Sequence, residues 1–266
     1  MSRLHRSWLA AGLALTLTFD AHAIRPFVTD DARVVGDRLA QLEAWMQIDR
    51  SVLEHNAFVA FGPHERVELT LGMVHGIVHS SQPRTYSITG PVAQGKLLLF
   101  EAKNNRWPGL AIAAGALSPL GHGPFTPRGW GGFGYLALTE SLFDEDLLIH
   151  ANVGFAAGDD GPQSSQLDLA TPRRSRMRAL LTAGVGLQAR LVAGLHLVSE
   201  IYHGDAYDPR TDFFASQAGF RYIFSDRVQM DSTFGTTLVA LEAENGQRRS
   251  EQWATLGLRL VTSELW

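Results

Sequence analysis

Two small groups of residues in this sequence have the types and spacing that chemistry requires. His79 and Ser81 are separated by one residue, and a histidine base beside a serine hydroxyl is an arrangement that cleaves esters. His203, Asp205 and Asp208 offer the nitrogen and carboxylate ligands that bind metal ions. However, the sequence shows no third residue that would orient His79. Histidine and aspartate residues at the spacing of the possible metal ligands also occur in any polar loop. We therefore expect no catalytic residue, no metal site and no cofactor, and the chain is not predicted to be an enzyme.

A pair of adjacent acids near the N-terminus is the third candidate. Asp30 and Asp31 stand in the stretch PFVTDDARVVGD, where Thr29 or Asp30 is suited to cap one turn of helix. A binding role would instead require this stretch to fold into the interior of the domain that follows. We favour the helix cap, and a binding segment in the interior of the domain stays open as the alternative.

Residues 1–23 have the three parts of a secretory signal peptide. Arg3 and Arg6 are basic, the run WLAAGLALTLT is apolar, and the small-residue sequence AHA follows at 21–23. The apolar run is shorter than the ~20 residues that a membrane-spanning helix needs. We therefore expect cleavage after Ala23 and export of a mature chain that begins at Ile24.

Charge and cysteine content exclude two further classes of protein. The 23 basic and 27 acidic residues give a formal net charge of −4, which offers no basic surface for nucleic acid. The chain has no cysteine, so no disulfide can stabilise a small exported core. Stability must come from the fold or from its surroundings.

Alternation of apolar and polar residues dominates the rest of the chain. Residues 177–188 show it most clearly, and the first such run lies at 38–49. A period of two indicates a strand with one apolar face. Similar runs recur as far as residue 262 and predict twelve strands, several of them as long as the roughly 9 to 11 residues of a tilted membrane-spanning strand. In the first run the apolar positions are Leu42, Ala44, Met46 and Ile48.

The connections between these runs alternate between tight and longer segments. GPHE, NNRW, SLFDE, RLVA and SDR are tight, whereas SPLGHGPFTPRG, GDDGPQSSQLDLATPRR and EAENGQRRS are long. A barrel threaded through a bilayer with both chain ends in the periplasm produces this alternation, and closure pairs every backbone amide. We predict an all-β fold, a transmembrane antiparallel up-and-down β-barrel of about twelve strands over residues 38–266, in the outer membrane of a Gram-negative bacterium.

The polar face of the predicted strands would line the lumen. A barrel of this size lies between small barrels filled by side chains and wide ones that hold an aqueous pore. The charges therefore either pair across the lumen and close it, or form a narrow, weakly selective conduit. The lumen-lining candidates are Glu43, Gln47, Glu68, Lys96, His150, Asn152, Arg178, Glu200, Gln217, Arg221, Asp231 and Arg259.

Aromatic residues fall near the predicted periplasmic ends of the strands, where an aromatic girdle belongs: Trp107, Phe143, Phe224 and Trp266. The ending LGLRLVTSELW also resembles the C-terminal strand of outer-membrane proteins, which closes on an aromatic residue that the assembly machinery reads. Glu264 departs from that pattern.

Two short motifs carry a family resemblance. The start of the mature chain resembles that of the outer-membrane proteins grouped as the "MetA-pathway of phenol degradation" family, and GKLLLFEAKNNRWPGLAIAAGALSPLG is similar to the family's fourth and fifth strands. The resemblance implies a channel or transport protein for hydrophobic or aromatic compounds, with residues 24–37 as a periplasmic lead-in before the barrel. The residues that match the first motif are Pro26, Thr29, Asp30, Asp31, Gly36, Leu42 and Glu43.

Taken together, these features predict a passive outer-membrane channel for small hydrophobic or aromatic compounds. The alternatives are a structural or partner-binding barrel with a closed lumen, and a lipid-modifying enzyme that uses His79 and Ser81. The expected partners are outer-membrane lipids and lipopolysaccharide, the assembly machinery and small hydrophobic or aromatic solutes, with no nucleic acid.

Overall fold

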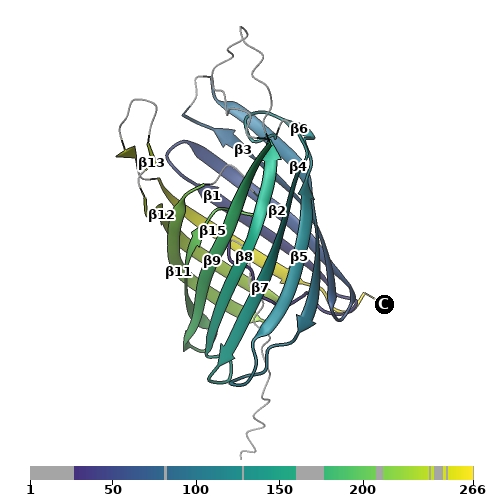
Figure 1. The fold of residues 1–266 in the computed structure, drawn as a ribbon. Helices are drawn as coiled ribbons and strands as arrows, with labels where there is room; N and C mark the ends of the chain where they lie inside the picture. The colour runs from purple at the N-terminus through teal and green to yellow at the C-terminus, as the bar shows by residue number, and fades with distance from the viewer. Residues whose placement is uncertain are drawn as a thin grey trace, which may run out of the picture.

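The computed structural model describes residues 27–80, 83–127, 129–159, 177–207, 212–239, 241–242, 248–249 and 251–265. Twelve long strands form its wall (Figure 1). They are β1 (Ala40–Ile48), β2 (Val52–His64), β3 (Val67–Val78), β4 (Thr85–Phe100), β5 (Gly109–Leu117), β7 (Gly131–Leu142), β8 (Leu147–Asp159), β9 (Met177–Val192), β10 (Leu195–His203), β11 (Phe214–Ser225), β12 (Val228–Thr237) and β15 (Gln252–Val261). In the described part of the chain no helix is long and apolar enough to cross a membrane.

The strands close into one antiparallel barrel. Each long strand pairs with its neighbours along the chain, and β1 pairs with both β2 and β15, so that Glu43 lies opposite Phe58 on one side and Arg259 on the other. The remaining short strands lie outside this ring: β6 (Gly121–His122) pairs with β4, and β13 (Leu241–Glu242) pairs with β14 (Arg248–Arg249). The predicted twelve-stranded barrel is confirmed.

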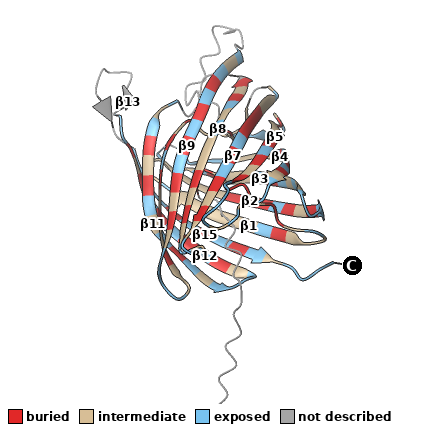
Figure 2. Ribbon diagram, turned by 60° about the horizontal axis from the view of Figure 1, so that its bottom comes forward, coloured by how far each residue is buried: buried red, intermediate tan, exposed pale blue. Residues whose placement is uncertain are grey.

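The barrel is apolar outside and polar inside. Along most of the long strands, exposed side chains alternate with buried or half-buried ones, which gives these strands their bands in Figure 2. Leu71 and Leu181 on the outer face are 57% and 67% exposed, whereas the inward-facing Arg221 and Arg259 are 1% and 2% exposed. This reverses the distribution of a water-soluble protein. The outer face is therefore suited to lipid, as in transmembrane β-barrels.

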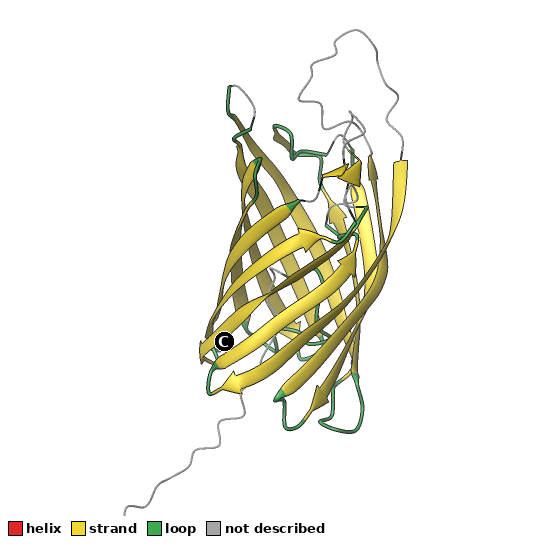
Figure 3. Ribbon diagram, turned by 90° about the vertical axis from the view of Figure 1, so that its left-hand side faces the viewer, coloured by secondary structure: helices red, strands yellow, loops and turns green. Residues whose placement is uncertain are grey.

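The two ends of the barrel differ in their connections (Figure 3). At one end, called here the short-turn end, the strands are joined by residues 65–66, 101–108, 143–146, 193–194 and 226–227. At the other, the long-loop end, the connections include residues 118–130, 160–176, 204–213 and 238–251. The predicted alternation holds with two departures, because the connection 49–51 at the long-loop end is short and 101–108 at the short-turn end is longer than expected.

Exposed aromatic rings lie at the short-turn end, which is the periplasmic end in barrels of this kind. Trp107 and Phe143 are each 66% exposed and Phe224 is 60% exposed. These three residues stand where the sequence placed a girdle, while Trp266 lies outside the described residues.

Candidate functional site

The N-terminal segment, residues 27–35, lies inside the barrel. Thr29 and Asp31 are 2% exposed and Ala32 is 1% exposed, although none of them belongs to a strand. The structure therefore places this part of the lead-in in the interior of the barrel, the possibility that the sequence left open. Alternation along the strands reveals which residues face the lumen, but it carries no information about what fills that lumen.

The segment enters and leaves through the short-turn end. The Phe27 ring lies 5.7 Å from the guanidinium carbon of Arg221, which is close to the β11–β12 turn. At the other end of the segment, Val35 N donates to the carboxylate of Glu68 near the start of β3. Asp30, between them, contacts residues in the middle of the wall. The segment is thus a loop inserted from the periplasmic end.

Wall side chains satisfy the backbone of this loop. A backbone that has no strand partner must find other hydrogen-bond groups when it is buried. The contacts are Val28 N to Glu200 Oε1 (2.9 Å), Thr29 N to Glu200 Oε2 (2.8 Å), Ala32 N to Thr139 Oγ1 (2.9 Å) and Val35 N to Glu68 Oε2 (2.9 Å). The side chain of Asn152 makes two hydrogen bonds to the backbone of Asp30: it accepts from the N–H and donates to the carbonyl oxygen (2.8 Å).

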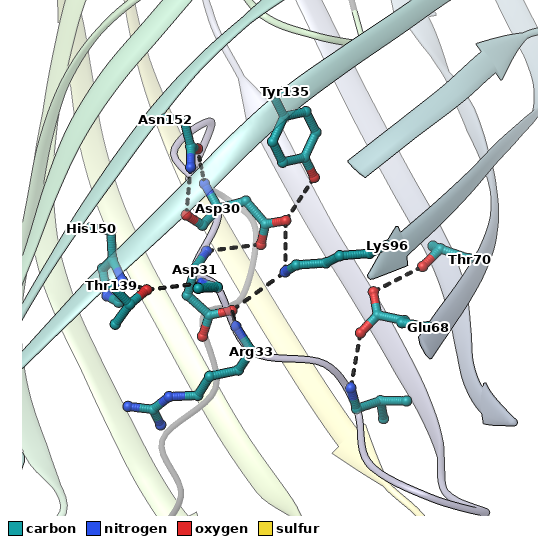
Figure 4. A network of polar contacts seen from close by, with 12 residues as sticks. Asp30, Asp31, Arg33, Glu68, Thr70, Lys96, Tyr135, Thr139, His150 and Asn152 are labelled. Carbon is teal, nitrogen blue, oxygen red and sulfur yellow. Dashed lines mark hydrogen bonds and ion pairs between the residues drawn. The ribbon is translucent and has the colours of Figure 1, made fainter. Parts of the chain in front are cut away.

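The acidic pair lies at the centre of the site (Figure 4). Lys96 Nζ is 2.9 Å from Asp30 Oδ2 and 3.5 Å from Asp31 Oδ1, and the Tyr135 hydroxyl donates to Asp30 Oδ2 over 2.6 Å. The side chains of Lys96 and Asp31 are only 3% and 4% exposed. The ammonium therefore attracts both carboxylates in a setting that water screens weakly, and the three groups together keep one net negative charge.

The helix predicted for this stretch does not form. In the structure, Asp31 Oδ1 accepts from Arg33 N (3.0 Å) and Asp30 Oδ1 accepts from Asp31 N (3.0 Å), while residues 27–37 contain no helical turn. Short side chains of this kind bind neighbouring backbone amides in turns as readily as at helix starts. The two aspartates thus accept hydrogen bonds from backbone amides, as a helix cap does, but no helix follows. The conformation of the loop is set by its contacts with the wall of the barrel.

Glycines in the wall leave room for the loop. A Cβ atom at Gly184 of β9 would lie 2.4 Å from Thr29 Oγ1, and one at Gly62 of β2 would lie 1.8 Å from the carbonyl oxygen of Gly36. Gly36 itself has a φ of +98°, which L-residues with a side chain rarely adopt. The wall is thus shaped around the inserted loop.

A second polar cluster fills the lumen nearer the short-turn end. Arg221 Nε donates to Asp231 Oδ1 and its NH1 to Gln188 Oε1, each over 2.6 Å. Arg259 Nε donates to Gln41 Oε1 over 2.6 Å, and Gln41 in turn donates to Glu43. The first group of contacts joins β9, β11 and β12 along the inner face of the wall, and the second joins β15 and β1.

The structure brings together most of the predicted lumen residues. Glu68, Lys96, Asn152 and Glu200 contact the loop directly, and Gln217 Nε2 donates to Glu200 Oε1 over 2.6 Å. His150 lies behind the loop, where its Nδ1 is 3.0 Å from Thr139 Oγ1. The residues of the second polar cluster that were predicted are Glu43, Arg221, Asp231 and Arg259.

Two predicted lumen residues lie apart from the site. Arg178 is paired with Asp212 at the long-loop end, where both side chains are 41% exposed. Gln47 is half-buried near the same end of β1. Strand alternation gives the inward direction of a side chain but not its height in the barrel.

An aromatic group that the sequence did not reveal lies above the loop, towards the long-loop end. The ring centroids of Phe58 and Trp45 are 5.1 Å apart, and Tyr207 lies 5.6 Å from Phe58 and 4.8 Å from Phe133. The Tyr207 hydroxyl donates to Gln94 Oε1, which also accepts from Tyr135. Alternation alone could have pointed Trp45, Phe58 and Phe133 inward, whereas Tyr207 comes from a connection and gave no such signal.

A narrow space runs beside the loop. A cavity of about 40 Å³ lies between the N-terminal segment and the inner faces of β1–β4, which is room for only a few water molecules. Its lining includes Asp30, Glu43, Glu68, Lys96 and Tyr207. The loop is therefore the feature that narrows the barrel at this level.

The catalytic and metal candidates do not come together in one site among the described residues. His203 contacts Asp212 and the Leu181 carbonyl oxygen, and Asp205 accepts from Tyr207 N. Ser81 and Asp208 lie outside the described residues, so neither pairing with them can be traced. In the ranges that the structure describes, no three histidine, cysteine or acidic residues converge on a point where a metal ion would bind.

No family model and no curated protein matches this chain. Among solved structures it is similar to the NanC porin (TM-score 0.54, 9% identity, covering 83% of this chain and 98% of the porin) and to the KdgM porin in complex with disordered oligogalacturonate (TM-score 0.55, 8% identity, 83% and 98%). An outer-membrane channel from Pseudomonas putida F1 is also similar (TM-score 0.54, 10% identity, 84% and 94%). At these identities the likeness shows a shared fold, that of outer-membrane β-barrels.

Proposed function

We propose that this protein is a passive outer-membrane channel for small hydrophobic or aromatic compounds, in which the N-terminal segment forms a displaceable constriction. One observation carries the proposal: the lumen is narrowed by a loop that is held by side-chain hydrogen bonds and one ion-pair cluster, without strand pairing. Such contacts can break without unfolding the wall. Because the loop enters and leaves at the periplasmic end, it can withdraw there and widen the path.

The outer face supports a membrane location. The exposed apolar belt and the aromatic rings at the short-turn end suit a bilayer, and the fold is that of outer-membrane barrels. A predicted signal peptide accounts for export.

The cargo class rests on the aromatic group above the loop. Tyr207 is half-buried and packs over Phe58 and Phe133, which are each 3% exposed, between the long-loop end and the constriction. Tyr207 is therefore the ring of this group that an entering solute would meet first. Aromatic rings interact favourably with other rings at centroid distances of this kind. The sequence resemblance to channels for hydrophobic or aromatic compounds points to the same class.

A barrel with a permanently closed lumen is the second candidate. The buried pair of Arg221 and Asp231, together with the contact between Arg259 and Gln41, favours it, because these buried side chains also occupy the lumen. In that case the protein would act through its outer loops or as a structural component.

Conductance separates the two candidates. The complete mature protein and a variant without residues 27–35 are compared in planar bilayers, with heat-dependent gel mobility as the check that both barrels are folded. A channel predicts small openings for the complete protein and larger ones for the shortened variant. A folded shortened variant without conductance would support the closed barrel instead.

Uptake into proteoliposomes tests the cargo. Phenylalanine and glutamine carry the same net charge and do not cross lipid readily, so the ratio of their entry rates measures preference for an aromatic side chain. The proposal predicts faster entry of phenylalanine. Equal entry rates of phenylalanine and glutamine through an open channel would support the channel and contradict the aromatic preference.

A further inference from the structure

A row of polar rings crosses the outer face of the barrel near the long-loop end. His55 of β2 lies directly opposite His75 of β3, with ring centroids 5.1 Å apart. His75 is 6.2 Å from Tyr86 of β4, and Tyr86 is 5.8 Å from His122 of β6. These four residues are called the histidine band.

The band faces outward on the wall suited to lipid. Val59 and Met73 share the outer faces of β2 and β3 with His55 and His75, and they are 52% and 39% exposed. Tyr86 is 47% exposed. Two imidazoles therefore stand at the upper edge of an apolar belt, where a polar ring needs a hydrogen-bond partner from the lipid headgroups.

The surroundings favour an anionic partner. Arg50 and Arg84 are exposed in the two connections next to the band. The nearby acids point elsewhere: Asp49 accepts from the backbone of Val52, and Glu54 faces the lumen, where it accepts from Asn56. An imidazole offers one N–H donor when neutral and two when protonated, and arginine binds phosphate oxygens well.

We propose that the histidine band binds a phosphate group of the glycolipid in the outer leaflet, that is, of lipopolysaccharide. The acyl chains of such a lipid would lie along the exposed apolar belt below the band, and its phosphate would meet the imidazoles and the flanking arginines. The inference rests on the outer-membrane location within the proposed function, but it does not require an open channel.

His203 provides a matched control. It lies on the outer side of β10 at the same end of the barrel, but its partners belong to the chain: Nδ1 is 3.0 Å from the Leu181 carbonyl oxygen and Nε2 is 3.3 Å from Asp212 Oδ1. The Phe214 ring packs against it with a centroid distance of 4.6 Å. This histidine is not expected to bind a lipid phosphate.

Thermal unfolding in detergent tests the proposal, because a ligand that binds the folded state raises Tm. The probes are phosphorylated lipid A, dephosphorylated lipid A, inorganic phosphate and zinc. We expect phosphorylated lipid A to give the largest increase in Tm for the wild type and for His203→Gln. The variant His55→Gln/His75→Gln should lose at least about half of that increase.

Three results would overturn the proposal. Dephosphorylated lipid A could raise Tm as much as the phosphorylated form, inorganic phosphate could act equally well, or the double variant could keep the full increase. Zinc stabilisation that is lost in the double variant, with no response to lipid A, would assign the band to a metal instead. If the double variant fails the gel-mobility check, His122→Gln is measured in its place. Conductance is recorded on the same samples, so failure of the channel proposal is seen separately.

Discussion

Lys96 Nζ lies 2.9 Å from Asp30 Oδ2 and 3.5 Å from Asp31 Oδ1, which makes this one side chain the charged link between the barrel wall and the loop inside it. Removing one partner of a buried ion pair costs about 3–5 kcal/mol, because the remaining charge loses its compensation. Two neighbouring carboxylates would be left without their cation. The position of the loop should therefore depend strongly on Lys96.

Replacement of Lys96 should release the loop. A cost of about 3 kcal/mol corresponds to a roughly hundredfold shift towards the displaced state, since each 1.4 kcal/mol is a factor of about ten. We expect Lys96→Met to raise single-channel conductance while the barrel stays folded by gel mobility. Unchanged conductance in a folded variant would argue against the loop as the constriction.

Thiol labelling follows the loop directly, because the chain contains no cysteine of its own. Ala32 is 1% exposed, so a cysteine placed there by Ala32→Cys should react slowly with a membrane-impermeant maleimide. Adding Lys96→Met should make it react quickly. Equal rates with and without Lys96→Met would mean that the loop does not move.

A single methyl group at Gly184 should also displace the loop. The new Cβ would lie 2.4 Å from Thr29 Oγ1, and overpacking of this kind costs about 1–3 kcal/mol. Gly186→Ala is the matched control, since its Cβ would meet Thr29 at an ordinary 3.6 Å. Conductance should rise for Gly184→Ala and not for Gly186→Ala, and a rise in both variants would trace the effect to β9 itself.

The aromatic group should set solute preference without setting conductance. Tyr207→Leu removes a ring that lies 4.8 Å from Phe133, together with a hydrogen bond worth about 0.5–1.5 kcal/mol. We expect the ratio of phenylalanine to glutamine uptake to fall while the single-channel conductance stays within the spread of the wild type. An unchanged uptake ratio would mean that Tyr207 does not contribute to solute preference.

Charge pairs inside and at the rim of the barrel should differ in their effect on stability. Asp231→Asn leaves Arg221 buried without its carboxylate and should cost about 3–5 kcal/mol, seen as a lower Tm. Arg178→Ala breaks a half-exposed pair and should cost no more than about 1 kcal/mol. Similar Tm losses for the two variants would contradict the burial difference on which this prediction rests.

The inward direction of most lumen residues could be inferred from sequence because it is a local property. Lys96 and Arg221 occupy positions whose neighbours along the strand are apolar, and the pleat sends those neighbours to the lipid side. Their partners could not be inferred. Arg221 of β11 meets Gln188 of β9 over the intervening β10, and only the pairing of these three strands brings the two side chains within 2.6 Å.

The sequence by itself determined the number of strands, the register of their apolar faces and the end at which the tight turns lie, since each follows from period-two patterning and connection length. Tertiary structure alone decided the fate of Thr29, Asp30 and Asp31. Their short side chains suit a helix start as well as a turn, and the choice came from Lys96, Asn152 and Glu200, which lie on distant strands and converge only when the barrel closes. The physical reason is that a buried loop takes its hydrogen bonds from whatever the surrounding wall presents.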